Sequence, residues 1–415
     1  MTMEERKVPE LRFKGFHDDW EQRKLEQISD KVTEKNKQEI FKEVLTNSAE
    51  FGIVSQESYF DKEIANVKNI SGYYIVRPND FVYNPRISNF APVGPIKRNT
   101  LFITGIMSPL YYVFRTKNIS TTYLQKYFES THWHRFMYMN GDSGARSDRF
   151  AIKDTTFNKM PIPYPVFEEQ KSISNFISKL DKIITLHQRK INILKEQQKA
   201  YLRIIFPSKN KNAPKLRFIS YTEKWNEYKL GELMEIGSVK RIHKSDWKEK
   251  GIRFLRARDI VSFFKNEEPA EKLYISRDTF ENYSKTTGKV SPGDLLVTGV
   301  GSIGVPLLIK DLKPLYFKDG NIIWFKNQTL DGYYFYYYFV SDNIQRFISN
   351  VAGIGTVGTY TISNGKKTPI KFPSMVEQKL IGHFLFKIEK NLLLNERKVK
   401  ALNKLKELYL RKMFL

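Results

Sequence analysis

The chain has 415 residues, 41% of them hydrophobic, which is enough for two or three globular domains with their own cores. It contains no cysteine, which excludes disulfides, thiolate catalysis and thiolate metal sites, and no apolar run is long enough to span a bilayer. A cytoplasmic location is therefore expected, and the formal net charge of +24 favours a polyanionic partner, nucleic acid first, over a charge that serves solubility alone.

Two stretches of the chain occur twice. The first, PELRFKGFHDDWEQRKL from Pro9, returns from Pro214 as PKLRFISYTEKWNEYKL with 7 of 17 positions identical. The second runs from Pro161 to Phe206 and matches the segment from Pro369 without a gap at 18 of 46 positions. The chain is therefore a tandem duplication. Because Arg12, Trp20 and their repeats Arg217 and Trp225 recur in both copies, we assign them to domain architecture.

Each copy opens with about 160 residues that are rich in Val, Ile, Tyr and Phe and often interrupted by Gly, Pro, Asn and Asp. This composition predicts a mainly β domain with many turns. Aromatic residues at helical spacing near Thr121–Tyr138 and Tyr333–Asn350 predict short helices that face a core. A Pro-x-x-x-Pro segment follows in both copies, at Pro161/Pro165 and Pro369/Pro373, and is expected to stop the preceding strand.

A long helix is predicted to end each copy, from about Glu168 to Phe206 and from about Glu377 to Phe414. Each helix carries an apolar stripe: Ile173, Phe176, Leu180, Ile184, Ile191 and Leu194, and then Ile381, Phe384, Ile388, Leu392, Val399 and Leu402. At 1.5 Å per residue such a helix is about 55–60 Å long. A stripe of that length must be buried, so we expect the two helices to pack antiparallel as a coiled-coil spacer.

The predicted fold is α+β with pseudo-twofold symmetry. Two mixed, β-rich target-recognition domains, residues 1–165 and 209–373, are each followed by a spacer helix, in residues 166–208 and 374–415. The part up to Ser208 has 32 basic and 24 acidic residues, and the remainder has 37 and 21, so both parts are basic. Two basic domains that have diverged from each other favour recognition of a bipartite, asymmetric DNA target in which each domain reads one half.

The order of these parts resembles the specificity subunit of type I restriction–modification enzymes. The motifs that carry the resemblance are LRF…W, EEQKSISNFISKLD and VEQKLIGHFLFKIE, and it covers essentially the whole chain. The resemblance implies double-stranded DNA, two methyltransferase subunits and an ATP-driven motor–nuclease subunit as partners. It also implies that S-adenosylmethionine, ATP and Mg²⁺ belong to those partners and that this chain is a non-catalytic subunit without a cofactor. The alternative is a stand-alone bipartite DNA-binding regulator.

Three motifs point to other functions. The segment Gly299-Val-Gly-Ser-Ile-Gly304 is a G-x-G-x-x-G, but Val305-Pro306 and further β-type residues follow, where a dinucleotide site needs a helix. We expect a turn whose glycines allow positive φ and the approach of another backbone, with DNA as a candidate. Asn84-Pro-Arg-Ile87 only faintly resembles the N-P-P-aromatic motif of adenine methyltransferases. The six histidines lack the spacing of a zinc site.

Arg, Lys, Asn and Gln read most base edges, and Lys and Arg hold phosphates. On that basis we predict a set of DNA-contacting residues in each domain, carried mostly on turns. In the first domain they are Tyr83, Asn84, Arg86, Ser88, Asn89, Lys97, Arg98, Arg146 and Arg149. In the second they are Lys240, Arg241, His243, Lys244, Arg256, Arg258, Thr298, Ser302, Lys366 and Lys367.

Overall fold

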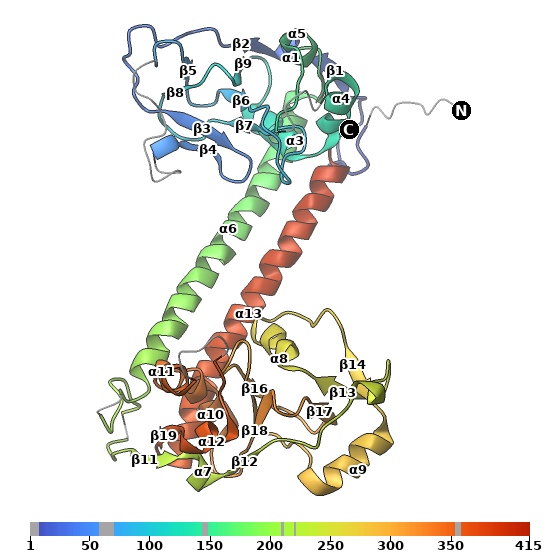
Figure 1. Cartoon of the computed structure of the whole chain (residues 1–415). Helices are drawn as coiled ribbons and strands as arrows, with labels where there is room; N and C mark the ends of the chain where they lie inside the picture. Colours follow the sequence, from blue (N-terminus) through green and yellow to red (C-terminus); the bar gives the residue numbers. More distant parts are fainter. Residues whose placement is uncertain (1–7, 58–69, 143–147, 209–210, 220, 353–357) are drawn as a thin grey trace. The chain divides into compact units, whose positions relative to one another are not determined.

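The computed structural model describes residues 8–57, 70–142, 148–208, 211–219, 221–352 and 358–415 (Figure 1). The chain forms two compact units. The first unit comprises Met1–His187 and Arg397–Leu415, and the second unit comprises Gln188–Glu396. No helix in the described part of the chain is both long and apolar enough to cross a membrane.

The first unit is built on a four-stranded antiparallel sheet with the order β2-β9-β6-β7. Two-stranded pairs β1-β10, β3-β4 and β5-β8 surround it. The strands are β1 Glu21–Lys24, β2 Ser29–Lys31, β3 Leu45–Ser48, β4 Gly52–Ser55, β5 Tyr74–Val76, β6 Phe81–Tyr83, β7 Ile96–Arg98, β8 Gly105–Met107, β9 Tyr112–Thr116 and β10 Pro161–Tyr164. The helices are α1 Leu25–Ile28, α3 Thr121–Glu129, α4 His132–Asn140, α5 Asp154–Phe157 and α6 Phe167–Ile204, whose last turns belong to the second unit.

The second unit repeats this sheet with the order β12-β18-β15-β16 and adds a second sheet, β14-β13-β17. Its strands are β11 Asn226–Lys229, β12 Glu235–Gly237, β13 Ile252–Leu255, β14 Leu273–Ile275, β15 Leu295–Thr298, β16 Pro306–Leu308, β17 Leu315–Phe317, β18 Ile322–Lys326 and β19 Pro369–Phe372. Its helices are α7 Leu230–Leu233, α8 Ala257–Phe264, α9 Arg277–Thr287, α10 Gly332–Phe339, α11 Asp342–Val351, α12 Ile362–Lys367 and α13 Met375–Lys412, whose end belongs to the first unit.

The central strands β6 and β15 enter the two sheets through the same kind of turn. The residue before the turn aspartate has a positive φ in both units, 75° at Asn79 and 99° at Gly293. The buried carboxylates of Asp80 and Asp294 then each accept a backbone N–H at 2.8 Å, from Arg77 and Ser291. The two segments are thus equivalent in three dimensions although few of their residues agree.

In the first unit, the start of α6 packs antiparallel against the end of α13. The rings of Phe176 and Tyr409 are 4.8 Å apart, and Asp181 Oδ1 lies 2.6 Å from Lys406 Nζ. Leu410, Met413 and Phe414 lie in the core cluster of this unit. The last residues of the chain therefore complete the hydrophobic core of its first domain.

The second unit contains the matching pair, in which the end of α6 packs against the start of α13. Tyr201 and Phe384 have ring centroids 4.9 Å apart, and Lys195 forms an ion pair with Glu396 at 2.9 Å. A side chain at Gly382 would lie 2.7 Å from the backbone nitrogen of Tyr334, which explains a glycine inside this helix. The antiparallel packing of the long helices is confirmed within each unit.

The repeated Arg and Trp hold the first turn of each long helix. The Arg12 guanidinium donates two hydrogen bonds to the fully buried Glu169 carboxylate, at 2.7 and 2.8 Å, and the Trp20 indole adds a third at 3.0 Å. This pairing raises the pKa of Arg12, because the hydrogen bond to Glu169 stabilises the charged guanidinium against the cost of its burial. The architectural role assigned to Arg12 and Trp20 is confirmed.

The second unit repeats the Arg–Glu pair but not the indole contact. Arg217 donates to Glu377 at 2.8 and 2.9 Å. The Trp225 indole nitrogen, although buried, has no hydrogen-bond partner among the described residues. The glutamine after each buried glutamate makes the same two hydrogen bonds in both units. Gln170 bonds to Ser120 N and Pro165 O, and Gln378 bonds to Asp331 N and Pro373 O. The bonds to Ser120 and Asp331 join the long helices to the starts of α3 and α10.

One prediction of local structure needs correction. The Pro-x-x-x-Pro segments do not merely stop a strand, because Pro161 and Pro369 are the first residues of β10 and β19, which pair antiparallel with β1 and β11. Proline is tolerated at the first position of a strand in a two-stranded pair. The short helices predicted in the aromatic stretches are confirmed, as α3 with α4 and α10 with α11. Their aromatic residues do face the core, as predicted.

Candidate nucleic-acid interface

In the first unit, the loop 84–95 leaves one end of the four-stranded sheet. It connects β6 to β7, and at this end Tyr83 pairs with both Ile96 and Tyr112. The tip is a turn in which Ser88 and Ala91 exchange backbone hydrogen bonds at 3.0 Å, leaving Asn89 exposed. The predicted contact residues on this loop are Asn84, Arg86, Ser88 and Asn89.

The segment 148–151 supports this loop from the side. Arg86 pairs with Arg149 in an isolated β-bridge, and Ile87 N donates to Asp148 O at 3.0 Å. The Arg86 side chain is 73% exposed and lies 3.8 Å from the Asp148 carboxylate, so it is free to reach an external acceptor. The structure thus brings together two arginines that are 63 positions apart in the sequence, whereas Arg146 lies outside the described residues.

Two of the first-domain predictions fall on residues whose side chains hold the fold. Tyr83 is only 3% exposed, stacks on Phe157 at 4.9 Å and donates its hydroxyl to Val93 O, so it is a core residue and that prediction is corrected. Asn84 is half-buried. Its amide donates to Asn47 O at 2.9 Å, and its carbonyl accepts from Arg86 N at 3.0 Å. In this structure Asn84 shapes the loop that displays Arg86.

The same end of the sheet in the second unit carries the basic cluster of residues 240–244. Strand β12 ends here, β15 ends here, and β18 begins here. Lys240, Arg241, His243 and Lys244 are exposed, and Arg241 Nε lies 3.4 Å from Asp319 on the loop before β18. The Lys240 ammonium lies 4.3 Å from the centre of the Tyr283 ring. The predicted residues found together at this end are Lys240, Arg241, His243, Lys244 and Ser302.

Arg256 is not available to DNA in this structure. Its side chain is 14% exposed and donates to Asp259 at 3.2 Å and to Glu271 at 2.8 Å, so the prediction of a DNA contact is corrected. Glu271 also accepts from Arg258 at 2.6 Å, although Arg258 remains 65% exposed. These hydrogen bonds and positive charges lower the pKa of Glu271.

Thr298 and the pair Lys366/Lys367 also differ from expectation. Thr298 is fully buried, and its hydroxyl donates to Ser302 O and accepts from Val305 N, so it closes the turn instead of facing DNA. Both lysines are exposed at the end of α12. A side chain at Gly231 would lie 2.9 Å from Lys366 Cβ, which places them beside α7 and the start of β12, away from the 240–244 cluster.

The glycine motif forms a turn between β15 and β16, with no helix after it, as predicted. Gly301 and Gly304 have positive φ, 71° and 75°. Gly299 does not need one. It is required because Tyr360 N donates to its carbonyl and an added Cβ would lie 2.7 Å from Tyr360 O. The backbone that approaches Gly299 belongs to the chain itself, whereas the space around Gly301 is open, so an approach of DNA to this turn stays a prediction.

Histidines and acidic residues do not converge in the described part of the chain: no three of them are close enough to hold a metal ion. His132 contacts Arg411 O at 3.0 Å through Nε2, and burial lowers the pKa of His134. His132 is thus in contact with the backbone of α13, and His134 is partly buried. What the two units share is an exposed, basic loop end on an equivalent sheet.

Comparisons with known proteins agree with this arrangement. The family model "Type I restriction modification DNA specificity domain" matches residues 17–196 and again residues 222–404. The type I restriction enzyme MjaVIII specificity subunit of Methanocaldococcus jannaschii is 28% identical over 258 residues, which are 59% of this chain. The match spans 58% of the length of that relative, less than two thirds.

Solved structures share the fold over nearly the whole chain. The type I restriction-modification system S subunit from M. genitalium has a TM-score of 0.59 at 14% identity, covering 98% of this chain and 99% of that one. A chain from a study of complex assembly and conformational transition of the type I R-M system has a TM-score of 0.55 at 13% identity, covering 96% and 98%. At such identity the likeness shows the fold alone, and it agrees with two repeated α+β domains and long helices.

Proposed function

Because the chain belongs to the type I restriction modification DNA specificity family, we propose that it is the specificity subunit of a type I restriction–modification enzyme. In this role it recognises an asymmetric, bipartite sequence in double-stranded DNA. It directs two methyltransferase subunits, and through the complex a motor–nuclease subunit, to methylate adenine or to cleave. It acts in the cytoplasm.

The observation that carries this proposal is that both units expose basic side chains at the same end of an equivalent antiparallel sheet. The loop after β6 exposes Arg86 and Asn89 in the first unit, and the segment after β12 exposes Arg241 and Lys244 in the second. Such side chains suit guanine, adenine and phosphate contacts. Since the two loop sets share almost no residues, the two half-sites should differ in sequence.

The chemistry belongs to the partner subunits in this proposal. S-adenosylmethionine, ATP and Mg²⁺ are bound by them, and this chain supplies recognition without a catalytic step. The long helices, each joined to one domain by its buried glutamate, are the natural surface for the methyltransferase subunits. Detectable methyl transfer by the isolated chain would contradict this division of work.

The test is methylome sequencing of cells that carry this gene and its partner genes. We expect a split adenine-methylation motif with two dissimilar halves separated by unread bases. Replacing loop 84–91 with the corresponding loop of another such domain should change one half only, and replacing 240–244 should change the other. A contiguous or palindromic motif, or a loop replacement that changes both halves, contradicts the proposal. A chain that binds a split site fully without partners is instead a stand-alone regulator.

A further inference from the structure

A pocket of about 680 Å³ runs along β7 in the first unit. It begins beside loop 84–95, where Phe90 lines it, and continues past Lys97 and Arg98 to the helix α3. The tip of the β3–β4 hairpin contributes Phe51, and the end of α13 contributes Lys406. The pocket therefore opens next to the loop that displays Arg86 and Asn89.

Two lysines of this region are neutralised by carboxylates. Lys126 contacts Glu129 at 2.8 Å and Asp181 at 2.5 Å, and Lys406 contacts the same two carboxylates at 2.9 and 2.6 Å. Burial alone would raise the pKa of Asp181, but the hydrogen bonds and charges of both lysines together lower it. This cluster of four is therefore balanced in charge.

Lys97 and Arg98 are different, because neither forms an ion pair with any residue that the structure describes. Both are half-buried. Arg98 Nη1 donates to the hydroxyls of Thr121 and Thr122 at 3.0 and 3.2 Å, while its buried Nε has no partner among the described residues. Burial is the main cause that lowers the pKa of both side chains, and the charge of Glu129 opposes it only in part, so a further anion in the pocket would stabilise their charged forms.

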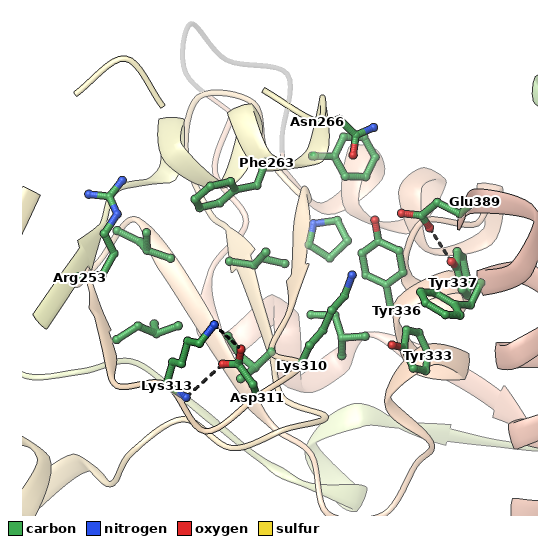
Figure 2. A pocket seen from close by; sticks show the side chains of 18 of the residues that line it. Arg253, Phe263, Asn266, Lys310, Asp311, Lys313, Tyr333, Tyr336, Tyr337 and Glu389 are labelled. Carbon is green, nitrogen blue, oxygen red and sulfur yellow. Dashed lines mark hydrogen bonds and ion pairs between the residues drawn. The ribbon is translucent and has the colours of Figure 1, made fainter. Parts of the chain in front are cut away.

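The second unit has a pocket of about 460 Å³ between the equivalent strand β16 and helix α10, and its cations, Arg253, Lys310 and Lys313, stand at other positions (Figure 2). By strand pairing, Leu307 and Leu308 occupy the positions of Lys97 and Arg98. Tyr337 occupies the position of Lys126 and donates to Glu389 (Figure 2). Arg253 and Lys310 also have no ion pair among the described residues, so what distinguishes the first unit is two consecutive cations on the strand that lines the pocket.

Two more carboxylates, Glu50 and Glu407, line the first pocket, and both are exposed. Water and salt screen exposed charges, whereas half-buried cations keep most of their field. Inside the pocket the field of Lys97 and Arg98 is therefore screened less than that of Glu50 and Glu407, which favours a compact anion with several acceptor oxygens.

We propose that this pocket, which we call the phosphate pocket, binds a phosphate group through Lys97 and Arg98. Resting on the proposed function, the favoured source is a DNA backbone phosphate beside the half-site read by the first unit. A phosphate monoester of a free nucleotide has the same chemistry and is the other source. In either case the contact positions the ligand and reads no base.

The first experiment measures DNA affinity against salt concentration for the complex with its methyltransferase subunits, on a duplex with the target and on one without it. Lys97→Leu introduces the residue that the second unit has at this position, and Lys97→Arg keeps the charge. For a backbone contact we expect Lys97→Leu to reduce the slope of log affinity against log salt by about 0.9, on both duplexes alike. Lys97→Arg should restore it.

The second experiment tests the free ligand, using thermal unfolding of the same complex with inorganic phosphate and with AMP. Stabilisation of the wild type that Lys97→Leu abolishes assigns the pocket to a free phosphate. No stabilisation, together with the reduced salt slope, assigns it to the DNA backbone. Lys310→Leu removes an exposed charge from the pocket of the second unit and serves as the matched control.

Three results overturn the phosphate pocket: unchanged salt slope and unchanged phosphate response in Lys97→Leu, an equal fall of the slope in Lys310→Leu, or an altered recognition sequence. If Lys97→Leu lowers the melting temperature without ligand, Lys97→Gln replaces it. A wild-type complex that binds no split sequence refutes the proposed function instead, so the two failures are distinguishable.

Discussion

The two units differ most where their sheets meet solvent and least where their long helices begin. At the helix starts the residues and their contacts repeat: Arg12 and Arg217, Glu169 and Glu377, Gln170 and Gln378, Tyr123 and Tyr334. At the loop ends almost nothing repeats. A duplicated recognition protein can therefore keep one scaffold constant, because a few buried polar contacts fix helix to sheet, while its exposed loops change freely.

The buried Arg–Glu pair should be the most sensitive point of that scaffold. Arg12→Met leaves the fully buried Glu169 without its bidentate partner, so we expect the first unit to lose about 3–5 kcal/mol of stability. Arg217→Met should do the same to the second unit. Amide hydrogen exchange followed by mass spectrometry reports on peptides from each unit separately.

Lys14→Met is the control for this pair, because Lys14 is exposed and close in sequence. Its effect should stay within about 0.5 kcal/mol. If Arg12→Met speeds exchange in the second unit as much as in the first, the clamps do not belong to separate units, and the comparison between the two halves loses its basis.

Phe414, near residue 415, should stabilise the core formed by the first domain. Phe414 is 2% exposed and packs on Tyr123 and Tyr127 with ring centroids 5.5 and 5.7 Å away. Phe414→Ala should destabilise the first unit by about 3–5 kcal/mol, because it removes a buried aromatic ring from the core. The matched variant Phe206→Ala should act on the second unit. If Phe414→Ala speeds hydrogen exchange in the second unit, or Phe206→Ala in the first, the assignment of these side chains to the two cores is wrong.

Local patterns in the sequence predicted the scaffold. The apolar stripes of the long helices follow from residue spacing along the sequence alone. The recurrence of Arg12 and Trp20 in both copies indicated their architectural role. The same signal was present for Glu169 and Gln170, which also recur in both copies, but their partners lie elsewhere in the chain. For example, the Ser120 N–H that Gln170 accepts is 50 positions away.

The exposed residues of the proposed DNA interface were harder to predict, because residue type does not determine burial. Tyr83 and Thr298 have suitable chemistry but lie in the core, and Arg256 is held by Glu271, 15 positions along the chain. Only the fold reveals such partners. Conversely, the pairing of Arg86 with Arg149 depends on a β-bridge between two loops. No pattern of neighbouring residues in the sequence predicts this bridge.

The two tryptophans allow a sharper comparison of the clamps. Trp20 donates to the Glu169 carboxylate at 3.0 Å, whereas the Trp225 indole nitrogen has no partner among the described residues. Trp→Phe removes similar ring volume in both units but a charge-assisted hydrogen bond in only one. Trp20→Phe should therefore cost about 1.5–3 kcal/mol more than Trp225→Phe by denaturant unfolding with exchange readout. Equal costs would show that this indole contact contributes nothing.

The smallest expected difference between the units is in how their stability changes with acid pH. The lysines beside Asp181 hold its pKa below the ordinary value, so this carboxylate stabilises the first unit above about pH 4, and the contribution is lost as pH falls through the folded pKa. At the equivalent place Glu389 faces the Tyr337 hydroxyl, whose pKa burial raises. Asp181→Asn should be less stable than the wild type at neutral pH and converge with it in acid, by hydrogen exchange from about pH 6 to about pH 3. Glu168→Gln, 74% exposed on the same helix, should show no such convergence. A gap that stays constant with pH would mean that Asp181 keeps its ordinary pKa in the fold.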